Sequence, residues 1–301
     1  MKKIGEMIQT PEVMDMKQKS LLSLSKEKHI QTFLKENQID ASLMQDYWVE
    51  LLDYNDDYKK CLSCSGLGKC SKDSQGMKKK IVYRDGEIVL ELESCGFGKQ
   101  WEQKRHLLEK FIITNVNEDM LLTDLQGLDI LKKSQLTPNE KLALAQITKY
   151  VKQPTQQGFF LHCEMGCGKT TLLAGLMNAL AKKGKEVGFI HFPTYLIDLK
   201  ASCSSGDNEY AMERLMKVDY LLLDGIGEEN VTPWSRDEIL LTILSYRLLN
   251  HLPTFFTSMY GYKDLNKVYT IKKGDEIRAN TLTSKMKALS IEIMLDGGKI
   301  R

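Results

Sequence analysis

The stretch GFFLHCEMGCGKTTLLAGLMNALAKKG, residues 158–184, decides the fold class of the chain. Its first residues form a short apolar run typical of a buried strand, and its second half repeats leucine and methionine at helical spacing until Gly184. Between them lies a glycine-rich loop, EMGCGKTT at 164–171. A strand, a glycine loop and a helix in this order direct backbone N–H groups and the helix dipole toward one anion. We therefore predict that the segment holds the phosphates of a nucleoside triphosphate.

Individual roles follow for the residues of this loop. Lys169 is expected to reach the outer phosphates as a point charge, and the hydroxyl of Thr170 to ligate the magnesium ion that accompanies them. The predicted nucleotide-binding residues are Glu164, Met165, Gly166, Cys167, Gly168, Lys169, Thr170 and Thr171. The full pattern G-x-x-x-x-G-K-[ST] has glycine where this chain has Cys163. The Cβ of that cysteine is expected to crowd the entry to the loop and to lower the affinity.

An acidic residue at the end of a second buried strand completes the predicted magnesium site. The segment DYLLLDGIG, residues 219–227, is apolar up to Asp224, which we assign to the magnesium shell and to catalysis. Gly225 follows it directly, at a place where a second acid would orient the attacking water. Glu228 and Glu229 come next and either reach inward or face solvent, with solvent the favoured interpretation. Glu228 is kept as a candidate catalytic residue.

The rest of the chain predicts two domains of different character. From 136 to 301 strand and helix patterns alternate, as in VGFIHF at 187–192 and TFFTS at 254–258, which indicates an α/β domain with a parallel sheet covered by helices. Residues 12–60 repeat apolar positions at helical intervals, and IVYRDGEIVLEL predicts a hairpin that turns at Asp85 and Gly86. We place a helical, zinc-binding domain at 1–112, a linker at 113–135 and the nucleotide-binding domain at 136–301.

A cluster of cysteines accompanies the predicted hairpin. Cys61, Cys64 and Cys70 lie within ten residues, and Cys95 follows the hairpin. Four thiolates can close a tetrahedral zinc site, which would add folding energy to a small domain. His106 is the rival to Cys70 as a ligand, and reduced free thiols or a thiol redox pair are the alternatives to zinc. Three further cysteines are expected to be reduced and unliganded: Cys163, Cys167 and Cys203.

Composition limits the possible classes of protein. The net charge of +2 is too small for the whole-chain field to indicate nucleic acid or membrane as a partner. No apolar run approaches the roughly 18 residues of a membrane span, and the first residues lack a signal peptide pattern. A soluble, cytoplasmic protein with no membrane partner is expected. Trp234 and Arg236 begin the helix after the acidic strand and either contact a neighbouring subunit or pack and cap that helix.

The order of these motifs resembles a known family. GFFLHCEMGCGKTTLL, YLLLDGIGEE, WSRDEILLTILSYR and LPTFFTS are similar to the AAA+ replicative helicase loaders of the primosomal, DnaI-like type. CLSCSGLGKC and IVYRDGEIVLELESC resemble the zinc-containing helicase-binding domain of the same proteins. The resemblance implies a helicase loader in DNA replication initiation, which grips the replicative helicase through its N-terminal zinc domain. It also implies that the AAA+ domain binds ATP and single-stranded DNA, and that the protein forms a homo-oligomer on the helicase ring.

The same resemblance implies that several catalytic positions have changed. The second acid of the family falls on Gly225, the first sensor on Met259, and the arginine finger on Lys285, which keeps the charge without the bidentate fork. The second sensor falls near Lys299 or Arg301. These changes predict weak ATP hydrolysis at most. A transposition helper ATPase and a catalytically inactive ATP-binding scaffold that modulates the helicase are the alternative functions.

Overall fold

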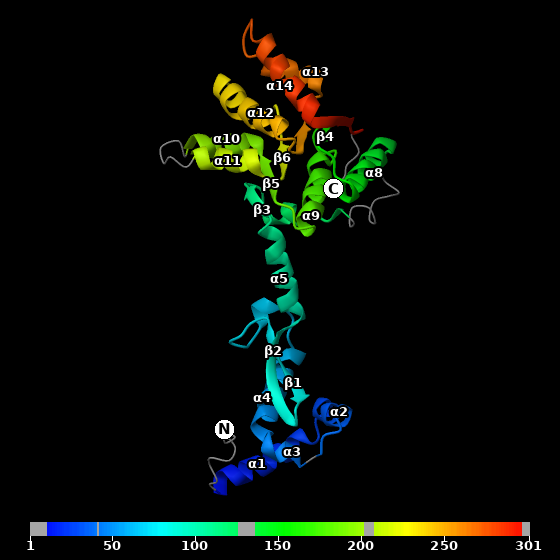
Figure 1. Cartoon of the computed structure of the whole chain (residues 1–301), viewed down its shortest axis with the longest axis vertical. Helices are drawn as coiled ribbons and strands as arrows, with labels where there is room; N and C mark the ends of the chain where they lie inside the picture. The colour runs from blue at the N-terminus through cyan, green and yellow to red at the C-terminus, as the bar shows by residue number, and fades with distance from the viewer. Residues whose placement is uncertain (1–10, 41, 126–135, 202–207, 297–301) are drawn as a thin grey trace. The chain divides into compact units, whose positions relative to one another are not determined.

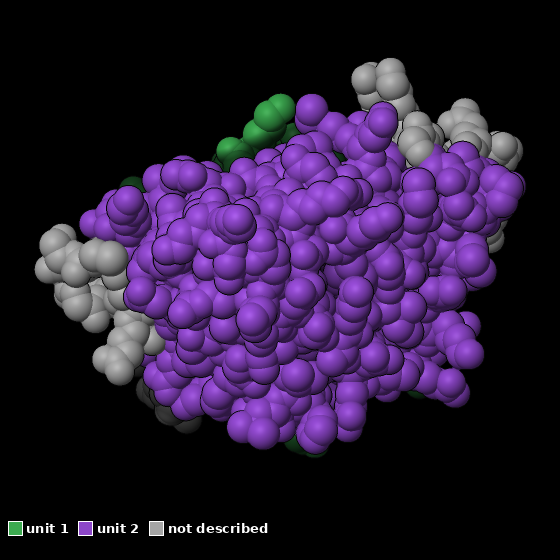
Figure 2. All heavy atoms as spheres, turned by 90° about the horizontal axis from the view of Figure 1, so that it is seen from above, with its two compact units in different colours: residues 1–104 green, residues 105–301 purple. Residues whose placement is uncertain are grey.

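The computed structural model describes residues 11–40, 42–125, 136–201 and 208–296, and it divides into two compact units at 1–104 and 105–301. Figure 2 colours the two units separately. Cys203, Lys299 and Arg301 lie outside the described residues. No described helix is both long enough and apolar enough to cross a membrane.

The first unit packs short helices against a β-hairpin. Its elements are α1 (Pro11–Leu24), α2 (Lys28–Glu36), α3 (Leu43–Asp46), α4 (Trp48–Leu62), the 3₁₀ turn η2 (Leu67–Lys69), β1 (Met77–Arg84), β2 (Glu87–Ser94) and the start of α5 (Gly96–Leu108). Asp85 and Gly86 form the predicted two-residue turn, with φ values of 53° and 83°. Positive φ at both positions gives the backbone the twist that such hairpins need. A small core that includes Ile30, Leu51 and Ile88 joins the helices to the hairpin.

The second unit confirms the predicted α/β class. Its described residues form a parallel sheet of six strands in the order β3-β5-β6-β7-β4-β8. Among these strands, Figure 1 labels β3, β4, β5 and β6. The strands are β3 (Phe111–Thr114), β4 (Gly158–His162), β5 (Val187–His191), β6 (Tyr220–Asp224), β7 (Thr254–Ser258) and β8 (Ser290–Met294). The helices are α6 (Glu118–Leu121), α8 (Pro138–Lys152), α9 (Lys169–Lys182), α10 (Phe192–Ala201), α11 (Asn208–Lys217), the π-helix η4 (Trp234–Leu240), α12 (Leu241–Leu249), α13 (Tyr262–Tyr269) and α14 (Glu276–Leu289).

Alternate strand residues face two different cores. Phe159 and Leu161 of β4 belong to a core that also contains residues of α8 and α9. Phe160, between them, belongs to a second core formed with residues of α10 to α14. Because neighbouring strand side chains point to opposite faces, the sheet lies between these two helical layers. All six parallel strands therefore end at the same edge, where the glycine loop follows β4.

The predicted linker needs correction. Residues 111–114 form β3, which pairs in parallel with β5, and α6 follows within the same unit. The side chain of Asn178 on α9 donates a hydrogen bond to the backbone oxygen of Leu121 at 2.7 Å, which fixes α6 to the core. The two compact units divide within α5 at 104/105, so β3 and α6 belong to the second unit. Pairing of a short edge strand depends on a partner more than 70 residues away, which the local pattern of 111–114 does not show. Residues 126–135 of the predicted linker lie outside the described residues.

A candidate nucleotide-binding site

The glycine loop lies between β4 and α9, as its sequence predicts. Gly166 and Gly168 have φ values of 88° and 85°, a left-handed conformation that glycine adopts without a Cβ clash. A pocket of about 530 Å³ opens beside the loop at the carboxyl edge of the sheet. Its lining is Met165, Gly166, Gly168, Lys169, Thr170, Thr171, His191, Asp224, Gly225, Glu228, Thr257 and Met259. Six of the eight loop residues predicted to bind nucleotide line this pocket, whereas Glu164 and Cys167 do not.

Lys169 places its ammonium group at the loop. Its Nζ donates hydrogen bonds to the backbone oxygens of Cys163 at 2.8 Å and Glu164 at 3.0 Å. Burial lowers the pKa of Lys169, and the negative charges of Glu228 and Asp224 partly oppose that effect. A phosphate entering the pocket would add negative charge beside the ammonium and further oppose the effect of its burial.

The predicted magnesium residues are brought together. The hydroxyl of Thr170 donates to Oδ1 of Asp224 at 2.6 Å. The hydroxyl of Thr257 donates to the same oxygen at 2.6 Å and accepts from the backbone N–H of Gly225 at 2.9 Å. Hydroxyl and carboxylate oxygens at this separation suit a magnesium ion, which prefers oxygen ligands. Thr257 was missed from the sequence, although its place near the end of the TFFTS strand could have indicated it.

The two cysteines of the loop depart from the expectation. Cys163 and Cys167 are joined in a disulfide, with their Cα atoms 6.6 Å apart. Lys169 Nζ lies 3.9 Å and 3.8 Å from the two sulfurs. The prediction of reduced, unliganded cysteines at these positions is therefore wrong for this pair. The turn of the glycine loop brings the two positions together, which a spacing of four residues does not by itself reveal.

The two glutamates after β6 have different surroundings. Glu228 lines the pocket. Glu229 is buried, accepting from the hydroxyl of Tyr269 at 2.8 Å and from the backbone N–H of Gly227 at 2.7 Å. Burial raises the pKa of Glu229. The favoured interpretation that both acids face solvent is thus wrong for Glu229, because the chain turns it toward α13.

Met259, at the first sensor position, and Lys285, at the arginine finger position, lie in different places in this chain. Met259 lines the pocket, where its thioether offers at most a weak acceptor. Lys285 lies elsewhere, in a shallow hollow formed by α12 and α14 with Leu248, Ile277 and Thr281. The structure therefore does not bring Lys285 to the pocket of its own chain.

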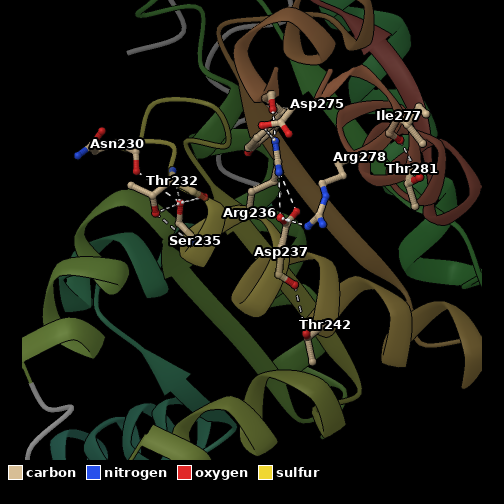
Figure 3. A network of polar contacts seen from close by, with 11 residues as sticks. Asn230, Thr232, Ser235, Arg236, Asp237, Thr242, Asp275, Ile277, Arg278 and Thr281 are labelled. Carbon is tan, nitrogen blue, oxygen red and sulfur yellow. Dashed lines mark hydrogen bonds and ion pairs between the residues drawn. The ribbon is translucent and has the colours of Figure 1, made fainter. Parts of the chain in front are cut away.

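Arg236 is part of a buried polar network, shown in Figure 3. Its Nε and Nη2 donate to the two carboxylate oxygens of Asp237 at 2.7 Å and 2.9 Å. Its Nη1 donates to the backbone oxygen of Tyr269 at 2.8 Å and to Asp275 at 3.2 Å. On the exposed side, Arg278 donates to Asp237 at 2.7 Å. Of the two open interpretations of Arg236, packing within the chain is the one that the structure shows.

The cysteines of the first unit line a second pocket of about 390 Å³. Cys61, Cys64, Cys70 and Cys95 all contribute to it. No three metal-ligating side chains among the described residues come together as a metal-binding group, so the predicted zinc site is not shown. His106 is exposed and pairs with Glu109, at 3.2 Å between Nδ1 and Oε2, and does not line the pocket.

Comparison with known proteins places the chain in a family. It matches the family described as IstB-like ATP binding protein over residues 100–288. It is 28% identical over 281 residues to the replicative helicase loader DnaI of Bacillus subtilis (strain 168), covering 90% of this chain and 89% of that protein. It is also 35% identical over 116 residues to the uncharacterized protein YqaM of the same organism, covering 36% of each chain.

Two solved structures support the same relationship. A crystal structure of DnaI superposes with a TM-score of 0.55 at 26% identity, covering 61% of this chain and 97% of that one. A putative primosome component from Streptococcus pyogenes serotype M3 superposes with a TM-score of 0.52 at 28% identity, covering 65% and 98%. With the family match extending over more than half of the chain, the protein belongs to the IstB-like ATP-binding proteins and is similar to the DnaI-like AAA+ helicase loaders.

Proposed function

We propose that this protein is a helicase loader that binds ATP at the pocket beside the glycine loop and acts with a replicative DNA helicase. The observation that carries the proposal is the meeting of Thr170 and Asp224 at 2.6 Å beside Lys169, in a chain similar to DnaI over 90% of its length. Lys169 and the loop N–H groups hold the phosphates. Thr170 and Asp224 hold a magnesium ion, which neutralises phosphate charge when it is bound.

Hydrolysis at this site is proposed to be slow. Gly225 brings no second carboxylate, and Met259 brings no strong hydrogen-bond donor or acceptor to the pocket. Binding needs the charge and the N–H groups, whereas hydrolysis also needs a group that activates water. The site is therefore better suited to sensing ATP than to rapid turnover.

Nucleotide binding is tested by replacing the loop lysine. Lys169→Ala should weaken the binding of a fluorescent ATP analogue with magnesium by about 10- to 100-fold, the loss expected for one charge-assisted contact. Lys182→Ala is the matched control, because that lysine lies at the end of the same helix and pairs with Asp124 at 3.3 Å. Equal affinity in the two variants would contradict the assignment of the pocket.

We also propose that the four cysteines of the first unit hold zinc. All four line the same pocket, which supports this, as do two contacts to sulfur: Lys72 Nζ lies 3.2 Å from Cys61 and the backbone N–H of Gly98 lies 3.3 Å from Cys95. Hydrogen bonds to the ligand atoms from a surrounding shell help to hold metal ligands in place. Elemental analysis of the full chain should find about one zinc per molecule, lost in Cys95→Ser and kept in Cys203→Ser. A metal-free wild-type chain would contradict the proposal.

The second unit is proposed to bind single-stranded DNA and to contact further copies of the chain. In such an assembly Lys285 would face the nucleotide of a neighbouring subunit.

The first unit is proposed to bind the helicase. Leu92 on β2 is 61% exposed and provides an apolar contact of the kind that protein interfaces use. Leu92→Asp should abolish co-purification with the cognate helicase, tested with and without ATP. Leu142→Asp on α8, where the leucine is 56% exposed, should retain it. The reverse pattern would show that the second unit carries the helicase contact.

Two alternative functions have specific support. The IstB-like match covers residues 100–288 only and so suits a transposition helper ATPase, which would not co-purify with a helicase. Gly225 and Met259 suit an inactive ATP-binding scaffold. Steady-state hydrolysis, measured with and without single-stranded DNA, separates the scaffold from an ATPase. Turnover that Lys169→Ala abolishes would exclude the scaffold.

A further inference from the structure

His191 lies at the pocket wall, beside the acid that ends β6. It ends β5, and in the sheet register it lies opposite Asp224, the last residue of β6. It lines the pocket together with Gly225 and Glu228. The side chain of Asn115 holds its backbone, accepting from the N–H at 2.8 Å and donating to the carbonyl oxygen at 3.1 Å. The end of β5 is therefore fixed from both sides, by β6 and by Asn115.

The imidazole of His191 borders the place that a side chain at position 225 would occupy. Gly225 has a φ of 78°, and a Cβ built on it would come within 3.2 Å of Nε2 of His191. The other ring nitrogen, Nδ1, contacts the hydroxyl of Thr194. This contact orients the ring so that Nε2 is the nitrogen turned toward Gly225. The space left by the absent second acid is thus bordered by a group that can accept a proton.

The other proton acceptors in or next to the pocket are less well placed. Oδ1 of Asp224 already accepts from two hydroxyls, those of Thr170 and Thr257. Glu228 is exposed, and Glu229 is directed toward Tyr269 and away from the pocket. At the pocket wall, the backbone of His191 is held by Asn115 and its ring is oriented by Thr194.

We propose that His191 accepts the proton of the attacking water in ATP hydrolysis, in place of the acid missing at position 225. This inference rests on the proposed nucleotide site. The water oxygen forms a bond to the γ-phosphorus, and the bond from that phosphorus to the β–γ bridging oxygen breaks, its electron pair leaving with ADP. One proton of the water moves to Nε2 of His191 and is later released to solvent, and the other stays on the phosphate that is formed. Atoms and charge balance without any further reactant.

The test compares chemistry with binding in the full-length chain. Single-turnover hydrolysis of γ-labelled ATP with magnesium should fall about 100-fold in His191→Gln, the contribution expected of a general base. Affinity for a fluorescent ATP analogue should change less than threefold. His251→Gln is the matched control and should hydrolyse at the wild-type rate, because His251 is exposed and does not line the pocket. Added imidazole should restore part of the activity of His191→Ala, which a purely structural role would not allow.

The outcomes separate this inference from the function on which it rests. Loss of hydrolysis in Glu228→Gln with normal hydrolysis in His191→Gln would overturn the role of His191. A wild-type chain that binds ATP but hydrolyses it no faster than His191→Gln would overturn it as well, while the nucleotide site stands. A wild-type chain that does not bind ATP would instead overturn the proposed function.

Discussion

The network around Arg236 supports a quantitative prediction for Arg236→Met. The guanidinium is 1% exposed and makes four hydrogen bonds, two to Asp237, one to Asp275 and one to the backbone oxygen of Tyr269. Methionine fills much of the same volume but leaves the carboxylate of Asp275 without this partner in a nearly buried site. Removing one member of such a pair costs about 3–5 kcal/mol. For a unit of this size, that loss lowers the melting temperature by roughly 6–20 °C.

Calorimetric unfolding of the full-length chain measures the effect. Arg278→Met is the matched control, because Arg278 is 63% exposed and its pair with Asp237 is expected to contribute less than about 1 kcal/mol. Arg236→Lys keeps the positive charge but loses the bidentate geometry of the guanidinium, so its loss of unfolding free energy should lie between those of the two variants. A loss below about 1 kcal/mol in Arg236→Met would refute the view that this network holds η4 to α13 and α14.

The same network predicts a dependence on pH. The hydrogen bond from Arg236 lowers the pKa of Asp237, and Arg278 adds to this effect. A carboxyl with a lowered pKa in the folded state stabilises the protein above its unfolded pKa of about 3.9, and that stabilisation disappears as the pH falls through the folded pKa. The stability difference between wild type and Arg236→Met should therefore shrink below about pH 4. A constant difference across this range would assign the loss to packing alone.

Three further predictions concern groups near the pocket. Burial raises the pKa of Glu229, so this carboxyl stabilises the fold less as the pH rises above its unfolded pKa of about 4.3. The unfolding free energy of wild type should therefore fall relative to that of Glu229→Gln over this range. Urea titrations that show a constant difference between the two would contradict this. Thr257→Val leaves the N–H of Gly225 without its acceptor and should lower the unfolding free energy, measured in urea, by about 1–3 kcal/mol. An unchanged unfolding free energy would show that water replaces the hydroxyl. Alkylation of the unfolded, unreduced chain should leave Cys163 and Cys167 unlabelled, and reduction should lower the unfolding free energy by about 2 kcal/mol; labelling of both would contradict the disulfide.

Local chemistry made part of this protein predictable from its sequence. The loop from Glu164 to Thr171 needs only its own glycines, its lysine and the flanking strand and helix, all within 27 residues. The turn at Asp85 and Gly86 likewise depends on the backbone freedom of the two residues that form it. Asp224 was found because a buried strand of leucines ends at it. In each case the signal and the structure lie in the same short segment.

Only the tertiary structure decided the features that depend on residues distant in sequence, or on side chains whose direction is set by packing. β3 joins the sheet because β5 lies beside it, and His191 reaches Gly225 because β5 and β6 are neighbours in register. Glu229 is buried because Tyr269, forty residues later, packs over it. The sequence of the glycine loop was enough to predict a phosphate-containing ligand, because phosphate binding is a property of the local backbone. The neighbours of Gly225 at the pocket were set by strand order, which the residue pattern of a single strand does not contain.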